Sequence, residues 1–241
     1  MRTIKKHEYG FTLVELSIVI VIIGLIVAGV TAGQSLVKQA KLSKIITDFN
    51  SYQVAYTSFK LQYDYLPGDI LNASSYWPSC DATPSNCNGN GNKRIEYTGT
   101  DSKRETMRVW QHLALAGLIP GTYTGTGDRC QLPNTSCPKG PIPDSVFVDR
   151  GDDGLVFWTW ENKPAFIFGK IVSSTILGVI NVAEAKSIDT KMDDGVANKG
   201  KMHGISGYGQ GGCSEGPGYA PGADYILSST TNTCYLTLSY R

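Results

Sequence analysis

The hydrophobic pattern is dominated by one long apolar stretch close to the N-terminus. From Leu16 to Val37 the chain carries no charged residue, and the segment LSIVIVIIGLIVAGV is almost wholly apolar. About twenty apolar residues, each rising about 1.5 Å along a helix, span the ~30 Å hydrocarbon core of a bilayer. The stretch therefore predicts a transmembrane helix over about residues 13–33. Because basic residues precede it within the first ten positions, we expect a cytoplasmic N-terminus, with the rest of the chain on the far side of the membrane.

Beyond this stretch the pattern changes to a stripe of aromatic and aliphatic residues. Its members recur at intervals of four, three, four, three and four residues: Ile45, Phe49, Tyr52, Tyr56, Phe59 and Tyr63. Such spacing places them on one face of an α-helix. No proline interrupts the chain from Phe11 to Leu66, and Pro67-Gly68 follows. We therefore predict one continuous helix over residues 11–66, whose second half packs its aromatic face against a globular head of residues 67–241.

The head alternates turn-forming segments with short β-branched and aromatic runs. The segment from Leu66 to Thr100 is dominated by turn-forming residues. Residues 105–118 have the pattern of a short amphipathic helix, and a further helix is expected around residues 181–192. Strands are expected at residues 145–149, 155–161, 165–172, 224–228 and 234–239. These elements predict an α+β fold, in which an antiparallel sheet of the head lies on the long helix.

Composition and charge exclude some classes of function. The chain has 22 Lys and Arg against 21 Asp and Glu, and a net charge of +1 does not indicate nucleic acid as the main partner. No nucleophile elbow, phosphate-binding loop, dinucleotide fingerprint or His-Glu-x-x-His motif occurs. His112 has no acid or nucleophile motif near it, so it is interpreted as a surface or packed histidine. We therefore expect neither an enzyme nor a bound cofactor.

The six cysteines all lie in the head, beyond residue 79, and none forms a Cys-x-x-Cys pair. Because zinc sites usually place their ligands two to four residues apart, disulfides in an oxidising compartment are the better interpretation. Six cysteines allow fifteen pairings, and the pairing of near neighbours is the simplest of them. The candidate bridges are Cys80–Cys87, Cys130–Cys137 and Cys213–Cys234.

Two acidic clusters raise the question of calcium. They are Asp149, Asp152 and Asp153, and Asp189, Asp193 and Asp194. Calcium needs several carboxylate oxygens, but neither cluster fits an EF-hand loop, and both contain the Asp-Asp-Gly sequence of an ordinary turn. We therefore expect no metal, and keep the second cluster as a weak calcium candidate.

Two explanations compete for the N-terminal apolar stretch. A removable signal peptide ends in a small-residue cleavage site, and VAGVTAGQ has that composition. Two features favour a retained anchor: the stretch is long for a signal core, and Glu15 lies just inside its start. A carboxylate at that depth costs roughly 2–3 kcal/mol on insertion scales, and a discarded leader gains nothing from it. Glu15 is therefore a functional candidate; the alternative is a side chain that only reaches the lipid headgroups.

The string GFTLVE at residues 10–15, behind a short basic leader and before an apolar helix, resembles the class III signal of type IV prepilins and type II secretion pseudopilins. The resemblance implies that residues 1–10 are a leader, cut by a prepilin peptidase between Gly10 and Phe11. Phe11 is then N-methylated, the helix is retained, and Glu15 neutralises the N-terminal amine of a neighbouring subunit. It also implies a pilin fold, and LPGD and WQHLALAGLI in the head resemble segments of larger prepilin-type proteins.

The resemblance also defines an expected function and location. We expect a structural subunit of a type IV pilus-like filament. Its partners would be prepilin peptidase, other pilin or pseudopilin subunits, the inner-membrane assembly platform and membrane lipid. The chain would be a single-pass protein of the bacterial inner membrane with a periplasmic head, and part of a surface filament after assembly. Two alternatives stay open, namely a pseudopilin that drives protein export in a type II secretion system and a membrane-tethered periplasmic binding protein.

Overall fold

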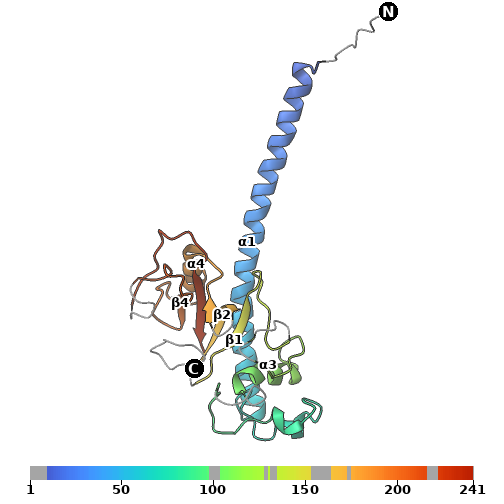
Figure 1. Cartoon of the computed structure of the whole chain (residues 1–241), viewed down its shortest axis with the longest axis vertical. Coiled ribbons are helices and arrows are strands. Elements are labelled where there is room, and N and C mark those ends of the chain that lie inside the picture. Colours follow the sequence, from blue (N-terminus) through green and yellow to red (C-terminus); the bar gives the residue numbers. More distant parts are fainter. Residues whose placement is uncertain are drawn as a thin grey trace, which may run out of the picture. The chain divides into compact units, whose positions relative to one another are not determined.

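The computed structural model describes residues 10–97, 104–127, 130, 135–152, 164–172, 175–215 and 222–240. The chain divides into two units, an N-terminal unit, Met1–Lys41, and a head unit, Leu42–Arg241. The first helix, α1, runs over Leu13–Tyr63 and contributes residues to both units. Figure 1 shows α1 in blue, followed by the elements of the head in colours from teal to red.

Helix α1 confirms the predicted continuous helix, with slightly shorter bounds. Asp64 has a positive φ of 56°, the left-handed conformation that commonly ends a helix. The Asp64 amide donates to the Lys60 carbonyl at 3.0 Å and closes the last turn. The helix therefore ends at Tyr63, before Leu66, the end that the sequence predicted. Within the head unit, α1 buries Ile45, Phe49, Tyr52, Ala55, Tyr56 and Phe59. This face is the predicted stripe with Ala55 added, whereas Tyr63 is half-buried.

The sheet of the head is antiparallel and has the strand order β1-β2-β5-β4, with β3 paired to β2 away from this path. The strands are β1 (Val146–Asp149), β2 (Ala165–Val172), β3 (Thr175–Leu177), β4 (Met202–Ser206) and β5 (Cys234–Ser239). Strand β2 is central, because β1 and β5 flank it with Phe147 opposite Phe168 and Phe166 opposite Leu238. The α+β class predicted from the sequence is confirmed.

Three of the predicted strands are present as β1, β2 and β5. The strand predicted at residues 224–228 is wrong: Tyr225 makes only an isolated bridge to Ser214, and Ile226 accepts a turn bond from Ser229. Strands β3 and β4 were not predicted. The strand predicted at residues 155–161 and most of the turn before it lie outside the described residues.

The remaining helices are short. They are α2 (Ala73–Tyr76), the 3-10 helix η1 (Pro84–Cys87), α3 (Glu105–Leu115) and α4 (Val182–Met192). Helix α3 ends before the predicted residue 118 because Gly117 has a φ of 70°, which ends the helix. Helix α4 begins with a capping box: the Asn181 side chain accepts from the Glu184 amide, and the Glu184 carboxylate accepts from the Asn181 amide.

The core between α1, α3 and the sheet is aromatic. Tyr52 of α1 lies 5.0 Å from Trp110 of α3 and 5.1 Å from Phe147 of β1, measured between ring centroids. Phe49 meets Phe147 edge-on, also at 5.1 Å. Each such side chain contributes roughly 1.5–3 kcal/mol by burial. The aromatic stripe predicted from the sequence is therefore the contact between α1 and the head.

Candidate functional site

The predicted processing site lies at the start of α1. Residues 10–12 are not helical, and the first helical hydrogen bond runs from the Leu16 amide to the Thr12 carbonyl at 3.2 Å. A peptidase would therefore reach the bond between Gly10 and Phe11 without breaking a helical turn. No described atom lies within 4 Å of a Cβ built on Gly10, so packing against the described residues does not require glycine there. As far as the described residues go, a requirement for glycine would come from a molecule that binds this segment.

Glu15 is tied to the start of the helix by a capping box. The Thr12 hydroxyl accepts from the Glu15 amide at 3.2 Å. In return, the Glu15 carboxylate accepts from the Thr12 amide and the Thr12 hydroxyl, each at 2.8 Å. Sequence analysis missed Thr12, although the Thr-x-x-Glu pattern that marks a capping box was visible in TLVE. Glu15 thus has a structural role within the chain in addition to any role in assembly.

The apolar part of α1 presents its side chains to the outside. Phe11 is 85% exposed and Leu13 is 87% exposed, and the other large apolar residues up to Val37 are also exposed. By length and composition, α1 is able to cross a membrane, and none of its most apolar window is buried. Apolar surface of this extent is stable only against lipid or another protein surface.

These features define the class of protein: a pilin-like α+β chain, in which an apolar N-terminal helix precedes an antiparallel sheet. In comparisons with known families, residues 5–31 match the prokaryotic N-terminal methylation motif. The chain therefore carries the class III signal of type IV pilins and pseudopilins, as the sequence resemblance predicted. No curated protein and no solved structure matches the chain.

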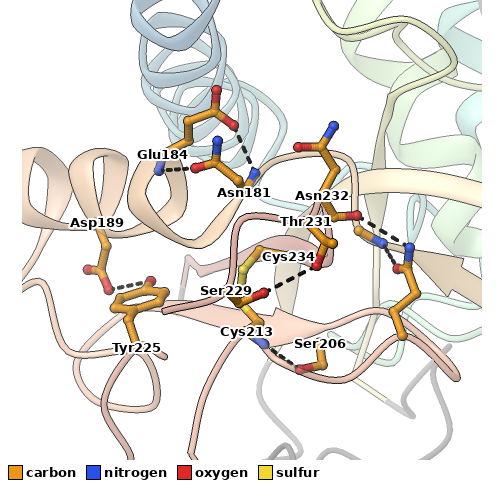
Figure 2. Close-up of a disulfide and its surroundings, with 12 residues drawn as sticks. Asn181, Glu184, Asp189, Ser206, Cys213, Tyr225, Ser229, Thr231, Asn232 and Cys234 are labelled. Carbon is orange, nitrogen blue, oxygen red and sulfur yellow. Dashed lines mark hydrogen bonds between the residues drawn. A yellow bond between two sulfur atoms is a disulfide. The ribbon is translucent and has the colours of Figure 1, made fainter. Parts of the chain in front are cut away.

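Two of the three predicted disulfides are present. Cys80–Cys87 has a Cα–Cα distance of 6.2 Å and Cys213–Cys234 one of 5.2 Å. The second bridge joins the start of β5 to the loop after β4, and the Cys213 amide also donates to the Ser206 hydroxyl at 3.0 Å (Figure 2). The first bridge closes a short loop that contains the 3-10 helix η1.

The third predicted pair is not bonded. Cys130 and Cys137 are free and buried, and the Cys137 thiol is directed at the Cys130 carbonyl, with a sulfur–oxygen distance of 3.9 Å. Burial raises the pKa of the Cys130 thiol, and the neighbouring Cys137 and Asp149 raise it further. In this arrangement the Cys137 sulfur contacts the backbone of Cys130 and is not bonded to its sulfur.

The candidate calcium cluster is close-packed but engaged by the protein. Oxygens of Asp189, Asp193 and Asp194 lie within 4.8 Å of one another. Asp189 accepts from the Tyr225 hydroxyl at 2.8 Å (Figure 2), and Asp193 accepts from the backbone amides of Lys201 and Met202. Burial raises the pKa of Asp189 to about 6. Asp189 therefore holds Tyr225 to α4, and Asp193 holds the start of β4 to the end of α4. The absence of a metal stays a prediction.

His112 is packed and serves the fold. Its Nδ1 accepts from the Gly68 amide at 2.9 Å, which leaves the proton on Nε2 to be donated to the Cys87 carbonyl at 3.0 Å. Burial lowers the pKa of His112 to about 3, so the ring stays neutral. Of the two interpretations from the sequence, the packed one is therefore confirmed.

Buried carboxylates hold the loop of residues 88–96, and the sequence did not identify them. Glu105 accepts from the amides of Asn90 at 2.9 Å and Glu96 at 3.0 Å. Asp69 accepts from the amides of Asn92 and Lys93. Burial raises the pKa of Glu105 to about 7, because desolvation outweighs the donated hydrogen bonds. These carboxylates organise a loop that has no regular secondary structure.

Proposed function

We propose that this chain is a structural subunit of a type IV pilus-like filament, cut after Gly10 and assembled through its apolar helix. The observation that carries the proposal is the class III signal over residues 5–31 in front of an exposed apolar helix. A signal of this class marks a substrate of prepilin peptidase, and the retained helix supplies the surface for assembly. The subunit acts without catalysis of its own.

Glu15 would supply the charge that directs assembly. After cleavage, the new α-amine of Phe11 is cationic near neutral pH, and it lies within one helical turn of Glu15. In a dry filament core, pairing this amine with the Glu15 carboxylate of a neighbouring subunit offsets part of the cost of burying both charges. Prepilin peptidase, the inner-membrane assembly platform and membrane lipid are the partners that this route requires.

Determination of the mature N-terminus tests the first step. We expect mass spectrometry of the membrane-extracted protein to find N-methylated Phe11 at the N-terminus. An intact Met1, or a cut near Gly33, would overturn the proposal in favour of a conventional anchor or a removed signal peptide. A membrane-tethered periplasmic binding protein would be the remaining interpretation in the first case.

The capping box allows the role of Glu15 in assembly to be separated from its role in the helix. Glu15→Gln keeps a side-chain oxygen for the Thr12 amide and removes the charge, whereas Glu15→Ala removes both. If charge pairing drives assembly, both variants insert and are cleaved, but neither forms filaments. Normal filaments from Glu15→Gln, with none from Glu15→Ala, would show that the cap, not the charge, is what assembly requires.

A pseudopilin of a type II secretion system is the second candidate, because the same signal serves both classes. Deletion of the gene discriminates between them. Loss of sheared surface filaments containing this chain supports the pilus. Loss of protein export without any surface filament supports the pseudopilin.

A further inference from the structure

An open pocket lies in the head unit, where the last turn of α1 meets the loop of residues 88–96. Its volume is about 430 Å³, within the range of roughly 300–1,000 Å³ that is usual for small-ligand sites. The residues that line it come from the end of α1, from the connection between α1 and α2, and from the loop; among them are Lys60, Asp64, Tyr65, Asp69, Gly91 and Lys93. The pocket is therefore built from segments that only the fold brings together.

The loop side of the pocket is anchored by Asp69, which is fully buried. Its carboxylate accepts from the amides of Asn92 at 3.1 Å and Lys93 at 2.8 Å. Its carbonyl accepts from the Gly91 amide at 3.2 Å. The wall that Gly91 and Lys93 form is therefore fixed to the segment that follows α1, and a preformed site loses less entropy when a ligand binds.

Two residues of the pocket have an uncommon backbone conformation. Asp64 has a φ of 56° and Lys93 a φ of 65°. In the described part of the chain only four residues other than glycine have a positive φ, and two of these four line the pocket. A left-handed backbone is costly for a lysine, and a glycine would adopt it without that cost. Because the backbone at position 93 does not require a lysine, its presence there indicates a role for the side chain.

The exposed charges of the pocket are available to a ligand. Within the described ranges, neither Lys60 nor Lys93 forms an ion pair, and Asp64 forms none either. All three side chains are exposed, whereas Asp69 is buried and its carboxylate already accepts from two loop amides. Two positive charges and one negative charge are left, which gives the exposed groups a net charge of +1.

We propose that this pocket binds a sugar acid, that is, a saccharide residue that carries a carboxylate. The ammonium groups of Lys60 and Lys93 bind the carboxylate through charged hydrogen bonds. Asp64 and the end of α1 accept from the sugar hydroxyls, since the last carbonyls of a helix lack partners within it. The ring of Tyr65 packs against the C–H groups of the sugar, which its partly negative face attracts. The net positive charge favours an anion over a neutral saccharide or a zwitterionic amino acid.

Calorimetric titration of the detergent-solubilised full-length protein tests the proposal. The probe is a trimer of galacturonic acid, and the comparison ligands are the uncharged trimer of galactose, glycine and inorganic phosphate. We expect the protein to bind the acidic trimer about tenfold more tightly than each comparison ligand. Added salt should weaken this binding, because it screens the exposed charges of the pocket.

Three substitutions distinguish the pocket from ordinary surface charge. Lys93→Gly removes the side chain and suits the left-handed backbone, so affinity should fall about tenfold while the urea midpoint of the head does not fall. Lys60→Gln should lower the affinity by a similar factor. Lys191→Gln is the matched control, because Lys191 is also an exposed lysine in the last turn of a helix, α4, and this variant should bind like the wild type.

Each outcome decides the proposal. Loss of binding in Lys93→Gly and Lys60→Gln, with binding kept in Lys191→Gln, assigns the sugar acid to this pocket. An equal loss in all three variants would mean that the trimer meets only general surface charge, which overturns the proposal. Equal binding of the galactose trimer, of phosphate or of glycine overturns it as well, and so does the absence of binding by the wild type. None of these results bears on cleavage after Gly10 or on filament formation, so the proposed function is tested separately.

Discussion

The N-terminal unit and the head unit use apolar residues in opposite ways. In the N-terminal unit, apolar side chains such as Ile20 and Ile26 are about three-fifths exposed, at 62% and 59%. In the head unit, Ile45 and Phe49 of the same helix are fully buried. One continuous helix thus changes from a surface that needs an external partner to one that the chain covers itself. The environment of α1, and not its secondary structure, distinguishes its two parts.

This difference assigns the stability of the fold to the head unit and the surface for assembly to the N-terminal unit. The head unit has an aromatic core, two disulfides and buried carboxylates that hold irregular loops. The described part of the N-terminal unit has local hydrogen bonds and the capping box of Thr12 and Glu15, so its apolar surface is satisfied only by lipid or by other subunits. We therefore expect substitutions in the head to change folding, and substitutions in the apolar helix to change insertion and assembly.

The largest effect is expected from the aromatic core. Phe147 is fully buried and meets Phe49, Tyr52 and Phe168, each at 5.1 Å between ring centroids. Phe147→Ala should lower the free energy of unfolding of the head by about 3–5 kcal/mol. Urea unfolding of detergent-solubilised protein, followed by tryptophan fluorescence, measures the loss. Phe147→Leu is the control, with a loss below about 1.5 kcal/mol, and an equally small loss for alanine would contradict the packing.

The disulfides provide the next effect. Cys213 and Cys234 are 21 residues apart, and Cys80 and Cys87 are seven apart. The chain-entropy estimate predicts a loss of about 3 kcal/mol when the longer loop is opened by a double alanine substitution, and about 1 kcal/mol less for the shorter one. Urea unfolding of the two double variants gives the comparison. A larger loss for the shorter loop would mean that local packing, rather than loop closure, determines the contribution.

The buried carboxylate of Glu105 predicts a pH dependence. Because its pKa is raised to about 7 in the folded head, its stabilising contribution is complete below about pH 4.5 and is lost as the pH rises through 7. His112, whose pKa is lowered to about 3, acts oppositely, since its contribution is complete above about pH 6.5 and is lost as the pH falls through 3. Between about pH 4.5 and 6.5 these two contributions change in opposite directions and offset each other, so we expect the decline due to Glu105 to show above about pH 6.5.

Substitution assigns the alkaline side of this profile. Glu105→Gln should flatten the decline in unfolding free energy between pH 6 and 8, because the titrating group is gone. Asp144→Asn is the control: its carboxyl is largely exposed and pairs with Lys170, which lowers its pKa, so its effect belongs to acid pH. An unchanged decline in Glu105→Gln would assign the pH dependence to another group.

The features that were predicted correctly depend on residues close together in the sequence, and those that were missed depend on contacts between distant residues. Helix α1, three strands and the methylation motif rest on local periodicity or spacing, and these were predicted.

The strand predicted at residues 224–228 is absent, because Tyr225 directs its hydroxyl to Asp189 of α4 instead of joining the sheet. Strand β4 was missed because it contains Gly204; a Cβ there would lie 2.3 Å from the Tyr225 ring, so the glycine reflects a contact made by distant residues. The carboxylates around the loop of residues 88–96 were missed for the same reason, since Asp69 and Asn92 are 23 residues apart.

The smallest effect on the head is expected from the apolar half of α1, and it tests the comparison most directly. Ile20→Ala and Ile45→Ala remove the same atoms from one helix, at positions that are 62% and 0% exposed. Ile45→Ala should lower the unfolding free energy of the head by about 2–5 kcal/mol, whereas Ile20→Ala should change it by less than about 0.5 kcal/mol. Urea unfolding in detergent measures both. If Ile20→Ala destabilised the head as strongly as Ile45→Ala, the two parts of α1 would be energetically coupled, and the division between an assembly helix and a self-sufficient head would fail.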